Sequence, residues 1–246
     1  MKKLTRALPI LLLPALVLVA SAARDHDDDC HDAIELDEAK VFIEFNSTDE
    51  DFGIHFFWDG VAWDKMKVDG PLGRTVLRVK ASRNLAAQGL TEGFFESDEP
   101  SVADLSMEEF LERFPEGTYE FEGRTLDHRE LEGETEFTHT LPAPPANLYP
   151  GGGAEVDSMS PLVASFDAVT EDLFGDPLVP EQYEVVLETE NEILRVFSII
   201  LEGDVEHPSV TVPPEFLEPD LEYKLEVIVQ EEGGNRTIAE TEFTTF

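Results

Sequence analysis

The sequence is short of cysteine: Cys30 is the only one among 246 residues. A single cysteine cannot form a disulfide within the chain, so the folded protein must depend on hydrophobic cores. Hydrophobic residues make up 41% of the sequence, which is enough to form such cores. Cys30 itself can pair with another chain, bind a metal or have no role.

Basic residues are also scarce. The chain has 17 Lys and Arg against 54 Asp and Glu, a formal net charge of −37 at pH 7. This excess of negative charge repels nucleic acids and anionic lipids and attracts cations. Salt screens the repulsion between like charges, so the composition suits a saline habitat. We therefore expect no nucleic-acid partner.

Long apolar runs are missing except for residues 7–20, which follow Lys2, Lys3 and Arg6. Small residues at 20–23 come next. This order is typical of a secretory signal peptide, here residues 1–23. The apolar run is shorter than the roughly 20 residues that span a membrane, so an uncleaved anchor is the weaker alternative. We expect a mature chain without a transmembrane span that is secreted, periplasmic or at the cell surface.

The sequence lacks every common catalytic motif that we sought. It has no Gly-x-Ser-x-Gly, no phosphate-binding glycine loop, no His-Glu-x-x-His and no Cys-x-x-Cys. Carboxylates are too abundant for a glycosidase pair to be selected from sequence. His55 is a lone histidine in a predicted strand, and such residues are usually packed or solvated. We predict no catalytic residue, no organic cofactor and no enzyme activity.

Residues 24–38 form an acidic tail rich in His and Asp. Its metal-binding residue types are His26, Asp28, Cys30 and His31. Such residues can hold a soft metal such as Zn²⁺, and the carboxylates leave Ca²⁺ possible. The alternative is a solvated acidic spacer. We favour the spacer because no second ligand cluster completes a defined site.

Residues 39–142 are predicted to form a β-rich domain with one short helix. Alternating apolar residues begin at Val41, and Asp59-Gly60 is a strong signal for a tight turn between strands. Ser106 and Glu109 form a capping box, which predicts a helix that ends before Pro115. Trp58 and Trp63 are either a platform for stacking on sugars or part of a buried sheet face, and we favour the buried face.

Residues 217–229 predict a strand that starts at a corner. Tyr223, Leu225, Val227 and Val229 alternate with polar residues, and Pro219 precedes them. The spacing Leu217-x-Pro219-x-x-x-Tyr223 matches a tyrosine corner, in which the ring is buried and its hydroxyl bonds to backbone.

Residues 143–246 therefore resemble the fibronectin type III family, although Phe166 stands where the family usually has Trp. The resemblance implies a β-sandwich of about 100 residues and no particular activity. Together with the N-terminal pattern it predicts an all-β chain of two β-sandwich-like domains.

Two sequons, at Asn46 and Asn235, are either glycosylation acceptors or ordinary turns. Our first hypothesis is an exported, non-catalytic binding or structural protein with an unknown protein or glycan as partner. The second is a cation- or carbohydrate-binding module that uses residues 25–32 or the two tryptophans. The third, less favoured, is a secreted hydrolase with an unrecognised N-terminal domain.

Overall fold

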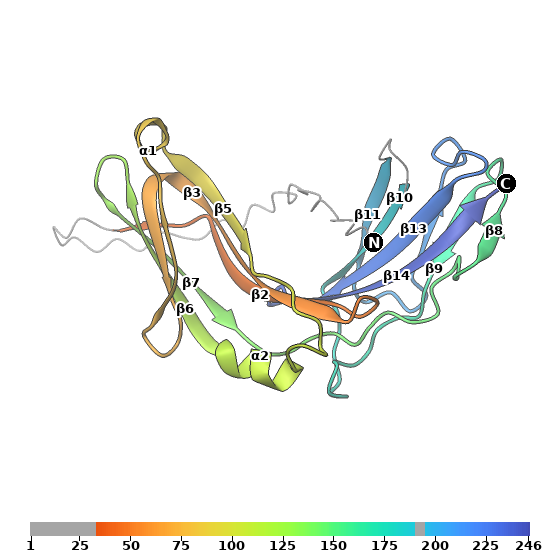
Figure 1. Ribbon diagram of the computed structural model, residues 1–246, viewed down its shortest axis with the longest axis horizontal. Coiled ribbons are helices and arrows are strands. Elements are labelled where there is room, and N and C mark those ends of the chain that lie inside the picture. The colour runs from red at the N-terminus through yellow and green to blue at the C-terminus, as the bar shows by residue number, and fades with distance from the viewer. Residues whose placement is uncertain (1–32, 190–194) are drawn as a thin grey trace. The chain divides into compact units, whose positions relative to one another are not determined.

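A computed structural model describes residues 33–189 and 195–246 (Figure 1). These residues form fourteen strands and two short helices, so the predicted all-β fold is confirmed. No helix in the described ranges has the length and apolarity needed to cross a membrane. The predicted signal peptide lies outside the described residues, and the domain boundary near residue 142 stays a prediction.

The N-terminal half, residues 33–142, is organised around one long strand. Strand β3 pairs along its first half with β2 on one side and β5 on the other, and along its second half with β4 and β6. The elements of this half are β1 Ile34–Glu35, β2 Glu38–Asn46, β3 Asp51–Asp69, β4 Thr75–Lys80, α1 Asn84–Gln88, β5 Leu90–Glu96, α2 Met107–Arg113, β6 Gly117–Thr125 and β7 Glu130–Phe137.

The first strands begin earlier than expected. The acidic tail was predicted to run to residue 38, but Ile34–Glu35 pairs in parallel with β7 and Glu38 already belongs to β2. Ile34 and Leu36 pack against the hydrophobic core, which explains why these residues join the sheet.

Helix α2 has the predicted capping box. The Ser106 hydroxyl accepts from the backbone N–H of Glu109 at 3.3 Å, and the Glu109 carboxylate accepts from the N–H of Ser106. Phe110 anchors the helix on the core, where its ring lies 4.6 Å from that of Phe52. Helix α1 was not predicted; it buries no residue.

The C-terminal half, residues 143–246, is a sandwich of two sheets. One sheet has the order β11-β10-β13-β14, with β8 beside β14, and the other consists of β9 and β12. Buried residues from both sheets form one hydrophobic cluster. The strands are β8 Ala154–Val156, β9 Leu162–Ser165, β10 Gln182–Thr189, β11 Val196–Glu202, β12 Ser209–Val212, β13 Glu222–Gln230 and β14 Arg236–Thr245.

The tyrosine corner is present. Tyr223 is fully buried, and its hydroxyl accepts from the N–H of Glu218 at 2.8 Å and donates to the carbonyl of Phe216 at 3.4 Å. Leu217 is buried in the same cluster. Phe166, in the place of the usual Trp, packs against Tyr183 with ring centroids 5.0 Å apart. The C-terminal half therefore has a fibronectin type III-like fold.

Strand β14 connects the two halves. It pairs in parallel with β2 through Arg236–Ile238, as Figure 1 shows where the two strands meet. The Asn235 side chain accepts from the N–H of Ile43 at 2.8 Å and donates to the carbonyls of Thr138 and Thr140, both at 3.0 Å. Asn235 is 1% exposed, so its amide is not accessible as a glycosylation acceptor. The described residues of both halves belong to one compact unit.

Candidate functional site

The two tryptophans do not form a sugar-binding platform. Trp58 and Trp63 are both fully buried, with ring centroids 5.7 Å apart, and Trp58 stacks on Phe95. Neither ring offers a face to a ligand, so this hypothesis is wrong and the buried-face interpretation holds. The reason is the path of β5: Gly93 lies against Trp58, and a Cβ there would come within 2.4 Å of the indole.

The predicted metal ligands His26, Asp28, Cys30 and His31 lie outside the described residues. The predicted structural residues do lie where the corner needs them. Leu217 and Tyr223 are in the core, and Pro219 is exposed in the turn between them.

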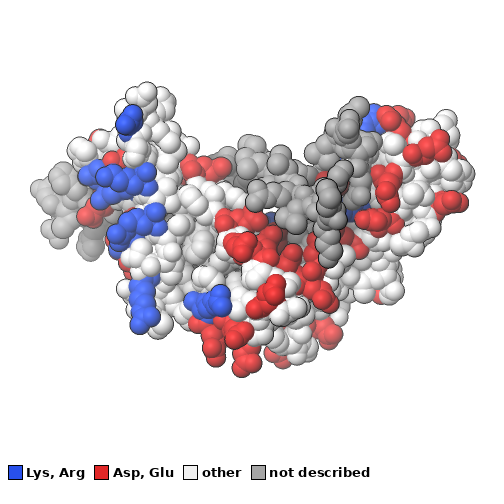
Figure 2. Space-filling view, viewed as in Figure 1, with Lys and Arg blue, Asp and Glu red and all other residues white. Residues whose placement is uncertain are grey.

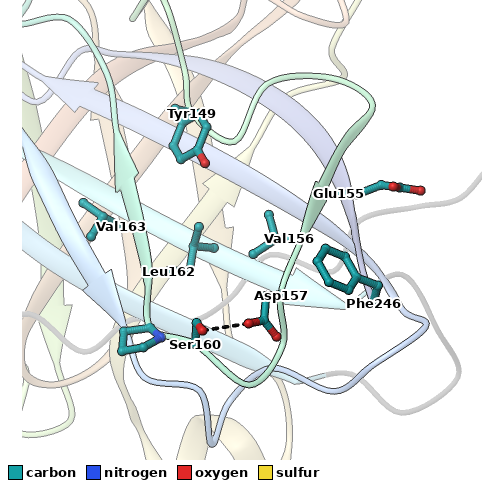
Figure 3. A pocket seen from close by; sticks show the side chains of 9 residues that line it. Tyr149, Glu155, Val156, Asp157, Ser160, Leu162, Val163 and Phe246 are labelled. Carbon is teal, nitrogen blue, oxygen red and sulfur yellow. Dashed lines mark hydrogen bonds between the residues drawn. The ribbon is translucent and has the colours of Figure 1, made fainter.

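A shallow pocket of about 370 Å³ in the C-terminal half offers no catalytic arrangement (Figure 3). Its walls include the exposed rings of Tyr149 and Phe246. The hydroxyl of Ser160 donates to Asp157 at 2.7 Å, which lowers the pKa of that carboxyl. A nucleophile needs an adjacent base that can accept its proton, and no histidine lines this pocket.

A second feature of the N-terminal half is a buried imidazole without partners. His55 lies in β3, is 2% exposed, and stacks on Phe42 at 4.8 Å with Phe94 at 5.5 Å. Within the part of the chain that the structure describes, neither Nδ1 nor Nε2 has a hydrogen-bond partner. Buried polar atoms are normally hydrogen-bonded, so this ring requires an explanation.

Two carboxylates face this imidazole. One oxygen each of Glu44 and Glu99 and one nitrogen of His55 all lie within 4.8 Å of one another. Glu44 comes from β2, opposite Gly53 of β3. Glu99 follows β5 and passes over Gly53, where a Cβ would lie 3.1 Å from its Cγ. We call His55, Glu44 and Glu99 the His55 triad.

The segment that carries Glu99 is fastened to β3. The hydroxyl of Ser97 accepts from the N–H of Ile54 at 3.0 Å, and the N–H of Ser97 donates to the carbonyl of Ile54. Glu99 is therefore placed over His55 by backbone bonds as well as by the space above Gly53.

The charges around the triad are unusual. Burial and the nearby Arg236 lower the pKa of His55 to about 3, which keeps the imidazole neutral. Desolvation, then the carboxylates of Glu96 and Glu44, raise the pKa of Glu99 to about 7. Arg236 forms an ion pair with Glu44, from Nε to Oε2 at 2.7 Å. The triad thus combines a neutral nitrogen donor with two crowded carboxyl groups.

Sequence reasoning missed this triad. His55 was recognised as a lone histidine in a strand, but Glu44 and Glu99 are two among 54 acidic residues. Glu44 could have been found from the register of a β2–β3 hairpin. Glu99 could not, because its position depends on β5 returning along β3.

A group of cations lies on the β3–β4 ladder. Lys65 is directly opposite Lys80, and Lys67 is directly opposite Arg78. We call these four residues the basic strip. Lys67 forms salt bridges with Asp69 at 2.7 Å and Glu122 at 2.9 Å. Among the described residues, Lys65, Arg78 and Lys80 have no salt-bridge partner.

The basic strip contrasts with the rest of the surface. Figure 2 shows Lys and Arg gathered at the side where β3 and β4 lie, whereas acidic residues cover much of the remaining described surface in that view. Arg74 and Arg83 flank β4 at its two ends. Strand β4 pairs only with β3, so its other edge is open among the described residues.

No protein-family model matches the chain, and no curated protein matches it. Solved structures with similarity include native Escherichia coli alpha-2-macroglobulin (14% identity, TM-score 0.33, 85% of this chain and 14% of that one). Others are the FN1–FN3 domains of chicken CNTN1 (11%, TM-score 0.36, 86% and 65%) and a two-domain fibronectin type III segment of chicken tenascin (10%, TM-score 0.31, 84% and 97%). All three TM-scores are below 0.5, so we take neither a function nor a family from them.

Proposed function

We propose that this chain is an exported, non-catalytic binding protein that recognises an anionic partner through the basic strip. The observation that carries the proposal is the register of β3 and β4, which places Lys65 against Lys80 and Lys67 against Arg78. Like charges directly opposite one another destabilise a sheet. A partner with negative groups would remove this repulsion on binding.

The dimensions of the strip favour an extended partner. Residues two apart on a strand are separated by roughly 6.7 Å, and neighbouring strands by about 4.8 Å. The four cations therefore form a flat array, in which Lys67 is already paired with Asp69 and Glu122 and the other three cations can meet a partner. A linear acidic polysaccharide presents charges in a row and fits such an array better than a compact anion does.

Charge on an edge strand can also serve only to protect against aggregation, because it prevents sheets from joining edge to edge. That role needs one or two charges on β4. It does not require a second row of lysines on β3, where Lys65 and Lys67 lie within the sheet between β4 and β6. The two-row arrangement is what favours binding over simple protection.

Export and the lack of catalysis are supported by sequence. Residues 1–23 have the order of a signal peptide, and none of the catalytic motifs sought is present. The fibronectin type III-like half is compatible with many roles and does not by itself select one.

The test compares the full-length chain with Arg78→Ser/Lys80→Ser. Calorimetry at low salt would measure binding to a carboxylated polysaccharide, a sulfated polysaccharide and a neutral dextran. We expect the double variant to bind the acidic polymers at least about fivefold more weakly, from two contacts of about 0.5 kcal/mol each. Physiological salt should weaken binding of the parent protein, and dextran should not bind.

Arg113→Ser/Arg195→Ser is the matched control, because it removes the same charge outside the strip. Its affinity should stay within about twofold of the parent. Equal losses in both double variants, or equal binding to dextran, would contradict the proposal. Release of hydrolysis products from any polymer, abolished by one carboxylate substitution, would contradict its non-catalytic part.

A further inference from the structure

The His55 imidazole has a donor capacity that the fold does not use. Its ring is 2% exposed and both nitrogens are without hydrogen-bond partners among the described residues. The stacking partners Phe42 and Phe94 explain why an aromatic ring fits this place, but a phenylalanine would satisfy them equally well. The choice of histidine therefore points to something that binds a ring nitrogen.

We propose that His55, Glu44 and Glu99 form a binding site for a transition-metal dication of the Zn²⁺ class. One ligand atom from each of the three lies within 4.8 Å of the other two. Zn²⁺ binds His nitrogen and carboxylate oxygen at about 2.0–2.2 Å in tetrahedral geometry, so two ligands on one ion lie about 3.3–3.6 Å apart. The three ligand atoms must therefore move about 1 Å closer together on binding, and the exposed Glu99 side chain is free to make such a movement.

The donor set selects the class of metal. Ca²⁺ and Mg²⁺ prefer sites made of oxygen, whereas imidazole suits Zn²⁺ and similar ions. The triad supplies one nitrogen and two oxygens from three separate segments: β3, β2 and the residues after β5. Three protein ligands leave a further position for water or for a group from a partner.

The surrounding charges permit a cation here. Arg236 is a positive group that acts on His55, and it already forms an ion pair with Glu44 through Oε2. A carboxylate has two oxygens, so Glu44 can bind the ion through Oε1 while it keeps the arginine. Glu96 and Asp51 add negative charge near the triad, as their electrostatic effect on Glu99 shows.

None of the three ligands belongs to residues 25–32, and the proposal does not depend on the anionic partner. The test therefore uses the full chain with His26→Ala, Cys30→Ala and His31→Ala, so that the tail cannot compete. In this background, calorimetry with Zn²⁺ should give one site per chain. Co²⁺ should produce a visible absorption band that Zn²⁺ displaces. Zn²⁺ should bind more tightly than Ca²⁺.

Two variants at matched positions decide the assignment. Glu99→Gln removes one ligand, whereas Glu96→Gln removes the same charge nearby and leaves the triad intact. We expect Glu99→Gln to weaken Zn²⁺ binding at least about tenfold and Glu96→Gln to change it less than about threefold. His55→Phe keeps the aromatic stack and should abolish binding.

Circular dichroism would show whether His55→Phe is folded; if it is not, the exposed Glu99 variant decides alone. Unchanged Zn²⁺ affinity in Glu99→Gln, equal losses in Glu99→Gln and Glu96→Gln, or no binding at millimolar Zn²⁺ would overturn the site. Tighter binding of Ca²⁺ than of Zn²⁺ would overturn the metal class.

Discussion

The two hydrophobic clusters differ in how far the polar atoms of their aromatic rings are hydrogen-bonded. Both tryptophans of the chain lie in the N-terminal cluster, and neither indole N–H has a hydrogen-bond partner among the described residues. In the C-terminal cluster, the hydroxyls of Tyr183 and Tyr223 each accept a backbone N–H at 2.8 Å. The N-terminal core depends mainly on ring packing, with one backbone bond from Tyr119, and the C-terminal core combines packing with two such bonds to backbone N–H groups.

This difference explains which half is recognisable from sequence. A hydroxyl that bonds to backbone a few residues away needs a fixed spacing in the chain, and this spacing is visible in the sequence as Pro219-x-x-x-Tyr223. Ring packing between Trp58 and Phe95 needs no spacing, since the two residues meet only because β5 pairs with β3. A chain can therefore contain two β-rich cores of which only one has a readable signature.

The largest effects on stability are expected from substitutions inside the two hydrophobic clusters. Trp58→Ala should lower the free energy of unfolding by about 4 kcal/mol, and Leu187→Ala in the C-terminal cluster by about 3 kcal/mol, because each leaves a cavity. Urea unfolding followed by circular dichroism measures both. Leu72→Ala, at a residue that is 71% exposed, is the control and should cost less than about 0.5 kcal/mol. A loss below about 1 kcal/mol at Trp58 would refute a core held by ring packing.

The second comparison concerns lysines. Lys224 lies among three carboxylates: it pairs with Glu188 at 3.0 Å, with Glu240 at 3.7 Å and with Glu226. Lys224→Met should destabilise the fold by about 3 kcal/mol, because three crowded carboxylates lose their shared cation. Lys80→Met should change stability by less than about 0.5 kcal/mol, since Lys80 is exposed.

Equal effects of the two lysine substitutions would show that surface charge, and not the local cluster, controls stability. The measurement is the urea midpoint at fixed salt. Repeating it at high salt should narrow the difference only slightly, because the Lys224 cluster is mostly shielded from solvent.

The third prediction tests the connection between the halves. Asn235→Ala removes bonds to Ile43, Thr138 and Thr140 and should cost about 2 kcal/mol. Ser160→Ala, which removes one exposed bond to Asp157, should cost less than about 0.5 kcal/mol. Hydrogen exchange should become faster in both β2 and β14 of the Asn235 variant. Faster exchange confined to one half would show that Asn235 does not couple them.

The smallest effects are expected at two tyrosines with the same local spacing. Each tyrosine follows a proline four residues upstream: Pro115 precedes Tyr119, and Pro219 precedes Tyr223. The Tyr119 hydroxyl donates to the carbonyl of Pro115 at 3.2 Å, and the Tyr223 hydroxyl accepts from the N–H of Glu218. Tyr119→Phe and Tyr223→Phe should each cost about 1 kcal/mol through lost hydrogen bonds. Unfolding midpoints report both. No shift at Tyr223 would remove the corner as a stabilising element, and no shift at Tyr119 would limit it to the C-terminal half.

The all-β class, the corner and helix α2 were predictable because each depends on neighbours in sequence. The Ser106–Glu109 box and the alternation after Tyr223 are local patterns. Helix α1 was missed because it buries nothing and so has no apolar periodicity. The basic strip was missed for a different reason, since Lys65 and Lys80 meet only through the register of β3 and β4.

The candidate metal site could not be predicted from the sequence for a similar reason. His55 could be noted, yet its two companions come from segments whose positions are set by strand pairing. Burial of Trp58 and Trp63 was weighed correctly against sugar binding, because aromatic residues favour strands. At Asn235 a local pattern was misleading. The sequon suggested an accessible side-chain amide, but the structure buries this amide at the connection between the halves.

The pairing of β2 with β14 has a consequence for folding during synthesis. Ile43 and Asn235, which bond across this connection, are 192 residues apart in the chain. A ribosome makes the chain from its N-terminus, so β2 emerges long before its partner strand exists. Until residues 235–238 arrive, the partly made chain carries a bare strand edge that is vulnerable to mispairing. The edge of β2 is thus completed only when a segment about 190 residues further along the chain is available.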